Sequence, residues 1–205
     1  MQVSRRQSAL SRIDAQNVSA DVSGEFGCWL GERQSLQFVN LRGDPDDQLF
    51  QQQVNDALGI RLPIQPNTVT QDGPLRVCWL GPDWWLVMAP ASDEMLQERL
   101  AEALTQQHIS LSDLTGGQML IEIGGRTTRD VLASACTLDL HPTQLPVGCC
   151  AQTQLAHTVV LIVPTIQEPE QAVVDIVVRR SFAEHLVRWL MDAAGEDGYA
   201  FRQSV

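Results

Sequence analysis

The chain has 205 residues, 44% of them hydrophobic, so it can bury the core of one large domain or of two small halves. Its 25 acidic residues outnumber 14 basic ones, all arginine. The net charge of -11 argues against a nucleic-acid binder, which neutralises phosphates with basic side chains. Apolar runs such as Val159–Val163 are too short to span a bilayer. Five cysteines without CxxC spacing or a secretory context predict reduced thiols, so we expect a cytoplasmic protein that binds no membrane.

The N-terminal segment lacks hydrophobic periodicity and carries several arginines, unlike the acidic remainder of the chain. We therefore expect residues 1–20 to form a flexible arm. Residues 21–205 are then the folded domain.

A strand and an amphipathic helix are the first regular elements after the arm. The strand covers residues 36–44, LQFVNLRGD. The helix covers residues 44–59, with Asp44 as its N-cap, Pro45 at the first helical position and Gly59 as its C-terminal stop.

A hairpin and a second helix complete the first half. Strands at residues 75–80 and 84–89 flank the turn GPD. The helix covers residues 92–107 and begins at Ser92 as N-cap. In both helices the apolar residues recur at the same offsets and form one stripe, so each helix is expected to cover one face of a sheet.

The second half repeats this order of elements. We expect a strand, a short helix, one long or two hairpinned strands, another strand and a closing helix, at residues 118–125, 126–136, 150–164, 171–180 and 181–195. The closing helix opens with a predicted capping box, Ser181 and Glu184, and ends at Gly195. The predicted fold is therefore α+β, with two packed βαββα-like halves, about 35–108 and 109–195, and mainly antiparallel sheets.

One short segment gathers cysteine and histidine, namely Cys136, His141, Cys149, Cys150 and His157. A zinc site, a cysteine nucleophile activated by histidine, and buried unreactive thiols are the three interpretations. Adjacent strand residues face opposite ways, so Cys149 and Cys150 cannot both point into one tetrahedral site without a distortion. Buried thiols are the favoured interpretation.

Two isolated carboxylates are the remaining candidates for chemistry. Glu122 and Asp175 each lie between apolar neighbours in predicted strands, as expected of the outward face of a half-buried strand, although either is a candidate catalytic group. The glycines of LTGGQMLIEIGG are expected in turns, because no phosphate-binding motif surrounds them. We therefore assign no catalytic, cofactor-binding or metal-binding residue.

Two features suggest a protein interface. The hairpin is apolar on both faces, so Trp84 and Trp85 are either buried within the chain or docked on another protein. Arg179 and Arg180 stand at a helix N-terminus, where cations oppose the helix dipole. Strand alternation sends them to opposite faces, so one can pair within the chain, for example with Glu184, and the other with a partner subunit. Two solvated arginines without partners are the alternative.

Several sequence blocks resemble one family, over roughly residues 35–192. The chain is similar to gamma subunits of heterotetrameric bacterial sarcosine oxidases in the blocks LRGD, LPIQPNT, WLGPDWWLV, LSDLTGGQMLIEIGG, RDVLASACTLDLHP, VGCCAQTQLA and VRRSFAEHLVRWL, which occur in the family's order. It departs from the pattern at Trp84, where the family usually has a carboxylate.

The resemblance implies a role within a larger enzyme. Such complexes oxidatively demethylate sarcosine to glycine, with FAD, NAD and covalent FMN on the alpha and beta subunits, tetrahydrofolate as one-carbon acceptor and zinc on the delta subunit. The gamma subunit resembles the folate-binding domain of aminomethyltransferases and is an accessory subunit without catalytic residues. Two alternatives remain: a free-standing folate-dependent aminomethyltransferase-like enzyme, in which Glu122 or Asp175 receives the pterin, or the same subunit role with another N-methylated amine, such as dimethylglycine or a methylated proline.

Overall fold

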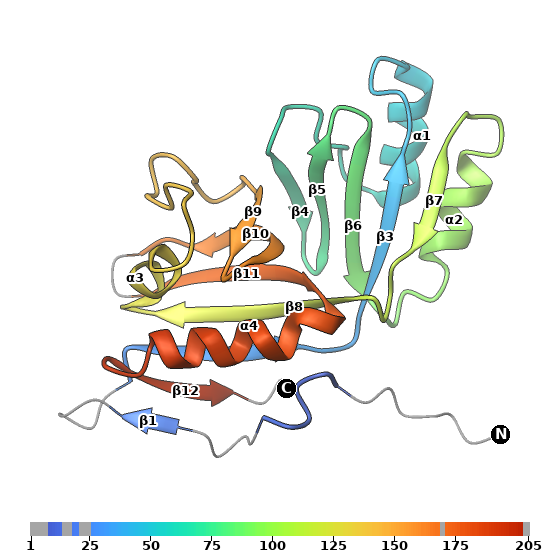
Figure 1. The fold of residues 1–205 in the computed structure, drawn as a ribbon. Coiled ribbons are helices and arrows are strands. Elements are labelled where there is room, and N and C mark those ends of the chain that lie inside the picture. The colour runs from blue at the N-terminus through green and yellow to red at the C-terminus, as the bar shows by residue number, and fades with distance from the viewer. Residues whose placement is uncertain (1–7, 14–17, 21–25, 169–170, 203–205) are drawn as a thin grey trace, which may run out of the picture.

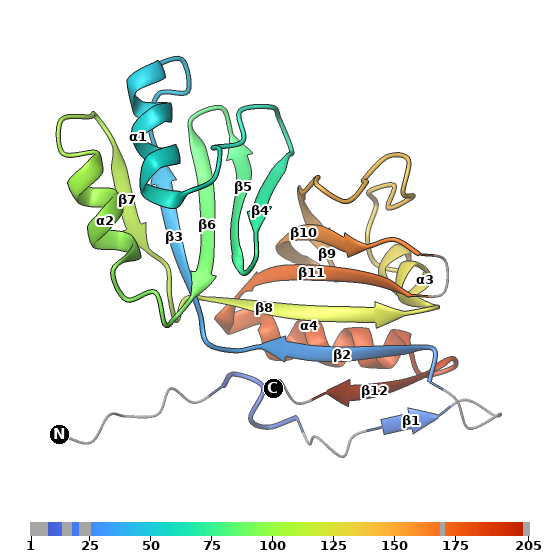
Figure 2. The ribbon, with the colours of Figure 1, turned by 180° about the vertical axis from the view of Figure 1, so that it is seen from behind.

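The chain folds into two mainly antiparallel sheets that pack face to face, each with helices on its outer side (Figures 1 and 2). The computed structural model describes residues 8–13, 18–20, 26–168 and 171–202. Strands of the two sheets run crosswise, so they contact over only part of their faces (Figure 1). None of the helices in these described ranges is long and apolar enough to cross a membrane.

The first half forms a five-stranded sheet with two helices. In chain order its elements are β3 (Leu36–Arg42), α1 (Gln48–Leu58), β4 (Val69–Asp72), β5 (Leu75–Gly81), β6 (Trp84–Pro90), α2 (Leu96–Ala103) and β7 (Ser110–Asp113). The spatial order is β4-β5-β6-β3-β7, with every neighbouring pair antiparallel. The hairpin predicted around GPD is β5–β6, and this expectation is confirmed.

The second half forms a seven-stranded sheet with two helices. Its elements are β8 (Gln118–Gly125), α3 (Thr128–Ala133), β9 (Ala151–Leu155), β10 (Thr158–Ile166), β11 (Ala172–Arg179), α4 (Arg180–Ala193) and β12 (Gly198–Arg202), joined by β1 (Val18–Ala20) and β2 (Cys28–Arg33). The spatial order is β1-β12-β2-β8-β11-β10-β9. The segment predicted as one long or two hairpinned strands is the β9–β10 hairpin.

The two halves repeat one topology. Each runs strand, helix, three strands, helix, strand, or βαβββαβ. The predicted βαββα-like halves are therefore confirmed, and each half has two more strands than predicted. Strands β4, β5, β6, β3 and β7 correspond in spatial order to β9, β10, β11, β8 and β12. The seven-stranded sheet has two additional strands: β1 at the edge beside β12, and β2, which lies between β8 and β12, antiparallel to the first and parallel to the second. The sequence gives no sign of this insertion, because sheet order depends on long-range pairing.

Strand alternation divides the hydrophobic residues among three layers. Beneath α1 and α2, one face of the five-stranded sheet buries Trp85 and Val87 against Phe50 of α1. Beneath α3 and α4, the seven-stranded sheet packs a larger core. The third layer joins the inner faces of the two sheets, with Phe38, Cys78, Leu86 and Met88 facing Leu120, Cys150, Leu161, Val163 and Val177. Both apolar faces of the β5–β6 hairpin are therefore covered within the chain: the helices cover one face and the second sheet covers the other.

The predicted start of the first helix is wrong. Helix α1 begins at Gln48 with Asp47 as its N-cap, whose side chain accepts a hydrogen bond from the Leu49 N–H at 2.8 Å. The Asp44 carboxylate instead accepts from the Asp46 N–H at 2.9 Å, which closes a turn before the helix. Gly59 ends the helix in the left-handed region, with φ of 73°, as predicted.

The predicted caps of α2 and α4 are also wrong. Helix α2 begins after Met95, and Ser92 makes no cap. Helix α4 begins at Arg180, one residue before Ser181, and has no side-chain cap. Glu184 does not complete a capping box, because its carboxylate accepts from Arg188, one turn later, at 2.9 and 3.0 Å.

Part of the predicted N-terminal arm packs on the domain. Leu10 and Ile13 are buried in the core beneath α4, and Val18–Ala20 pairs with β12. These stretches therefore belong to the folded unit. The rest of the predicted arm, residues 1–7 and 14–17, lies outside the described residues.

Candidate partner-docking groove

A groove lies where the inner faces of the two sheets diverge. It encloses about 550 Å³, and its lining includes Asn40, Trp84, Leu114, Gln152, Val159 and Arg179. Both halves of the chain contribute, through β3 and β6 on one wall and β9, β10 and β11 on the other. Two of the four residues predicted to contact a partner, Trp84 and Arg179, thus come together at one site from distant parts of the chain.

The Trp84 indole is held in place by two neighbours. Its Nε1 donates a hydrogen bond to Oδ1 of Asn40 on the adjacent strand. The Arg42 guanidinium stacks on the ring at 4.7 Å from the centroid and also contacts Asp83 at 3.4 Å. Trp84 therefore presents a partly exposed aromatic surface of fixed orientation, and little side-chain entropy remains to be lost on binding.

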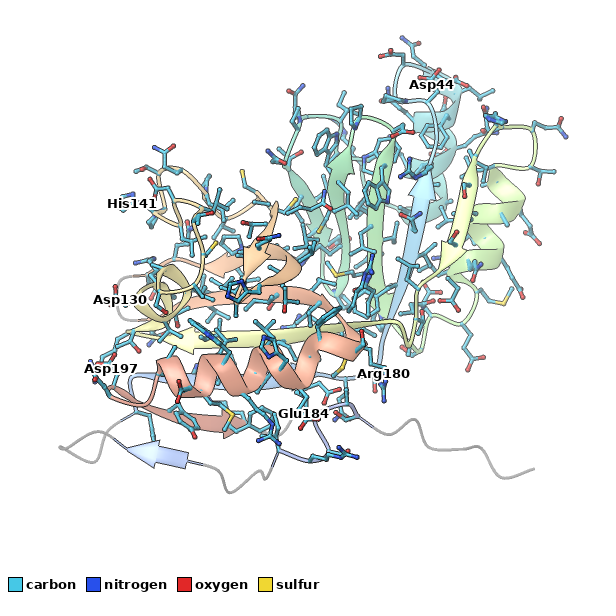
Figure 3. The ribbon with its side chains drawn as sticks, viewed as in Figure 1. Asp44, Asp130, His141, Arg180, Glu184 and Asp197 are labelled. Atoms are coloured by element: carbon cyan, nitrogen blue, oxygen red, sulfur yellow. The ribbon has the colours of Figure 1, made fainter. Side chains whose placement is uncertain are left out.

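Arg179 supplies a cation to the same groove. It is exposed at the end of β11, and no hydrogen bond or ion pair joins its side chain to another described residue. Arg180 lies in a second hollow, of about 290 Å³, beside Arg33. The two side chains diverge as strand alternation predicts. Figure 3 shows Arg180 at the N-terminal end of α4, one turn before Glu184, which pairs with Arg188.

Trp85 occupies a different position from the one expected of an interface residue. Its side chain is fully buried under α1, where its ring lies 5.8 Å from that of Phe50. Its Nε1 donates to the Pro63 carbonyl at 2.7 Å. A partner has no access to Trp85 in this structure, so the interface prediction is kept for Trp84, Arg179 and Arg180 only.

The two candidate carboxylates both face arginines of this chain. Asp175 is fully buried, and Arg76 Nη1 donates to its Oδ2 at 2.6 Å from the other sheet. Glu122, opposite Asp175 on β8, pairs with Arg33, whose Nη1 also lies 3.9 Å from Asp175. Asp175 is closed to a pterin because it has no exposure, and Glu122 is already paired with Arg33. The arrangement fits an internal ion-pair network.

The cysteine and histidine residues of segment 136–157 do not converge. Cys136 is buried, Cys149 is half-buried and Cys150 is buried against the other sheet. His141 lies on the loop after α3 (Figure 3), where Nδ1 contacts the Thr143 hydroxyl at 2.8 Å. His157 lies in the β9–β10 turn. Within the described ranges, no three metal-ligating side chains form a cluster.

One thiol contact could not be read from the sequence. Cys78 of β5 meets Cys150 between the sheets, and this contact together with burial raises the pKa of Cys78 well above its ordinary value. The Cys150 thiol also lies 3.4 Å from the Trp79 carbonyl. The pair is part of the packing between the halves. The weak sequence signal was the alternation that puts Cys78 on the face opposite Trp79.

Comparison with known proteins places the chain in a family. A model described as the sarcosine oxidase, gamma subunit family matches residues 42–196. The chain belongs to this family. Two relatives, both described as sarcosine oxidase subunit gamma, come from Corynebacterium. The strain U-96 protein is 31% identical, over 93% of this chain and 91% of the relative. The strain P-1 protein is 36% identical, over 69% of this chain and 68% of the relative.

Solved structures agree with this gamma-subunit assignment. A heterotetrameric sarcosine oxidase from Corynebacterium sp. U-96, in complex with pyrrole 2-carboxylate, contains a chain with a TM-score of 0.81 and 30% identity. The match covers 93% of this chain and 95% of that one. Aminomethyltransferase T of the glycine cleavage system from Bartonella henselae matches with a TM-score of 0.60 and 16% identity, over 88% of this chain and 48% of that one. The second likeness concerns fold alone, and it confirms the expected aminomethyltransferase-like architecture.

Proposed function

We propose that this chain is the accessory, non-catalytic gamma subunit of a heterotetrameric sarcosine oxidase, contributing to the assembly and stability of the complex. The observation that carries the proposal is the match in sequence and fold, over nearly the full length, to a chain of such a complex. The partners are then the alpha, beta and delta subunits. The reaction of the whole complex is oxidative demethylation of sarcosine to glycine.

Cofactors belong to the other subunits in this proposal. FAD, FMN, NAD, tetrahydrofolate and zinc are assigned to them, and this chain supplies none of the reacting groups. The internal pairing of Glu122 and Asp175 supports that division, because these carboxylates were among the candidates for chemistry. It also disfavours a free-standing folate enzyme. A complex acting on another N-methylated amine stays open, since the substrate pocket would lie on another subunit.

The groove gives this chain a physical means of docking. Trp84 offers a rigid aromatic wall, and Arg179 offers a cation that can pair with a carboxylate of another subunit. Tryptophan and arginine are the side chains most enriched among residues that dominate binding energy. A partner side chain seated in the groove would touch both halves at once and thereby hold them in one arrangement.

Purification of the native complex through a tag on this chain tests the proposal. The expected product contains three further subunits, is yellow from bound flavin and oxidises sarcosine, whereas the isolated chain is colourless and inert. A preparation free of other subunits that still carries stoichiometric flavin or folate would contradict the accessory role.

The groove is tested with single substitutions in the reconstituted complex. Trp84→Glu is expected to weaken binding of the other subunits by about 2 kcal/mol or more, and Arg179→Gln to weaken it and flatten its salt dependence. Arg61→Gln, at an exposed arginine outside the groove, is the control and should change neither quantity. If Trp84→Glu lowers the melting temperature of the isolated chain but leaves binding of the other subunits unchanged, Trp84 serves the fold rather than the interface.

A further inference from the structure

Among the residues that the structure describes, none covers one part of the inner face of the seven-stranded sheet. The five-stranded sheet packs over Leu120, Leu161 and Val177, whereas β2 and β12 lie at the far side of the sheet (Figures 1 and 2). There the inner-facing residues of β2 and β12 line a hollow of about 760 Å³. The surface formed by Phe26, Trp29, Arg126 and Arg202 is termed the Trp29 platform below.

The Trp29 side chain is restrained by two neighbours. It lies over Gly124 of β8, where a Cβ atom would overlap the indole ring. The Arg202 guanidinium lies over the same ring, 4.2 Å from its centroid. Both contacts restrict the position of the indole on the sheet. Packing within the chain therefore prepares a surface that the chain itself, over its described residues, leaves partly open.

The charge of the Trp29 platform is opposite to that of the whole chain. Its lining includes Arg126 and Arg202, and none of the described residues that line it carries a carboxylate. The complete chain has 25 acidic residues against 14 basic ones. Beside the arginines, Phe26 is 48% exposed. Basic and aromatic groups thus meet at one open surface on an acidic protein.

We infer that the Trp29 platform docks an acidic segment of another subunit, one that places a hydrophobic side chain against Phe26 and Trp29 and a carboxylate against Arg202. The surface is open, whereas small-ligand sites enclose most of their ligand. Exposed aromatic and arginine side chains together are typical of interface centres. This inference rests on the proposed function, because the partner is a subunit of the same complex.

The Trp29 platform is separate from the groove. The groove meets β8 at Gln118, and the platform meets it at Gly125. Seven strand residues at about 3.3 Å each put roughly 23 Å between these two points. A subunit interface of ordinary size can span that distance, and two smaller interfaces with different subunits can also use the two ends. Either arrangement covers the platform.

Side-chain footprinting of the assembled complex with hydroxyl radicals is the direct test. Phe26 and Trp29 are expected to react in the isolated chain and to be protected in the tetramer. If the tetramer forms and both react as before, the platform inference is overturned while the proposed function stands. Failure of the chain to assemble at all counts against the proposed function itself. Protection already present in the isolated chain would show that the chain covers the surface itself, which also overturns the inference.

A charge reversal supplies the second test. Arg202→Glu should weaken binding of the other subunits by about tenfold or more and flatten its salt dependence, while the melting temperature of the isolated chain falls only slightly, through loss of the exposed contact with Trp29. Arg61→Glu, also at an exposed arginine, is the matched control and should bind normally. Wild-type affinity and salt dependence in Arg202→Glu would overturn the inference. So would dimerisation of the isolated chain that this substitution abolishes, because the occupant would then be a second copy.

Discussion

Asp175 puts a carboxylate between the two sheets, where none of its side chain is exposed. Its partner Arg76 comes from β5, and Gln71 accepts from the Arg76 Nε at 3.1 Å. Because water cannot reach Asp175, loss of Arg76 would leave its charge with only the more distant Arg33, 3.9 Å away, to compensate it. The pair therefore fixes how β5 lies against β11.

Asp175→Asn should lower the free energy of unfolding by about 3–5 kcal/mol, because the buried Arg76 cation then lacks its counter-charge. Urea denaturation of the isolated chain measures this. Glu184→Gln breaks the exposed pair with Arg188 and is the control, with an expected loss below about 1 kcal/mol. A double variant, Arg76→Met with Asp175→Leu, should recover much of the loss. If Asp175→Asn and Glu184→Gln lower the free energy of unfolding by the same amount, burial does not make the Arg76–Asp175 pair matter more than an exposed pair.

Cys28 provides a pH-dependent contribution to stability. Burial raises the pKa of its thiol from the ordinary 9.0 to about 11, and the nearby Asp197 charge adds to the shift. Below pH 9 the thiol is protonated in both the folded and unfolded states, so its contribution is fully present. Between pH 9 and 11 the unfolded chain releases the proton first, so stability falls as pH rises, by about 2 kcal/mol in total. In Cys28→Ala this pH-dependent loss of stability should be absent. The measurement is the unfolding free energy of both proteins at about pH 8.5 and about pH 11, and the decrease between the two pH values should be about 2 kcal/mol smaller in the variant.

The β9–β10 hairpin turns through two residues that are both in the left-handed region, Ala156 with φ of 48° and His157 with φ of 63°. Two-residue hairpin turns favour this geometry, but every residue other than glycine is strained in it because its Cβ atom crowds the backbone. His157→Gly should therefore raise the unfolding free energy by about 0.5–1 kcal/mol, after the added freedom of the unfolded chain is deducted. Thermal unfolding of both variants measures this. His108→Gly, at an exposed histidine outside the left-handed region, is the control and should not stabilise the protein.

The strands and helices were largely predictable, whereas the helix starts were not. Strand β8 coincides with its predicted range, because a short apolar run and the glycines on both sides mark it locally. Helix α4 starts one residue early since the Arg180 N–H donates to the Gly117 carbonyl at 2.9 Å, a contact between distant segments. At α1 the sequence predicted Asp44 as the cap, and the structure instead assigns Asp44 to a turn and Asp47 to the helix N-cap.

Two residues of the groove, Trp84 and Arg179, could be predicted as partner contacts from the sequence, whereas the groove itself could not. The hairpin that is apolar on both faces indicates Trp84, and a cation at a helix N-terminus, where it opposes the helix dipole, indicates Arg179. Their meeting depends on the divergence of two sheets, which no local pattern encodes. The same pattern also suggested Trp85, because an apolar residue on either face of a hairpin looks alike in sequence. Only the tertiary structure shows that α1 covers that face.

Across the whole molecule, two copies of one topology share a single inner layer. Each half would expose this apolar face if the other unfolded, including Phe38, Leu86 and Met88 on one side and Leu120 and Leu161 on the other. The Arg76–Asp175 pair crosses the same boundary. A half of this size has too small a core to lose so much burial and remain folded.

The two halves should therefore unfold together. Native-state hydrogen exchange in increasing urea is expected to give the slowest amides of β6 and of β11 the same opening free energy, because neither sheet remains folded without the other. Far-UV circular dichroism and tryptophan fluorescence should show coincident midpoints. Asp175→Asn is expected to lower the opening free energies of both strands by equal amounts, which separates coupling across the boundary from local destabilisation of β11. Two resolved transitions, or a loss confined to β11 in that variant, would show that the halves are independent units that merely touch.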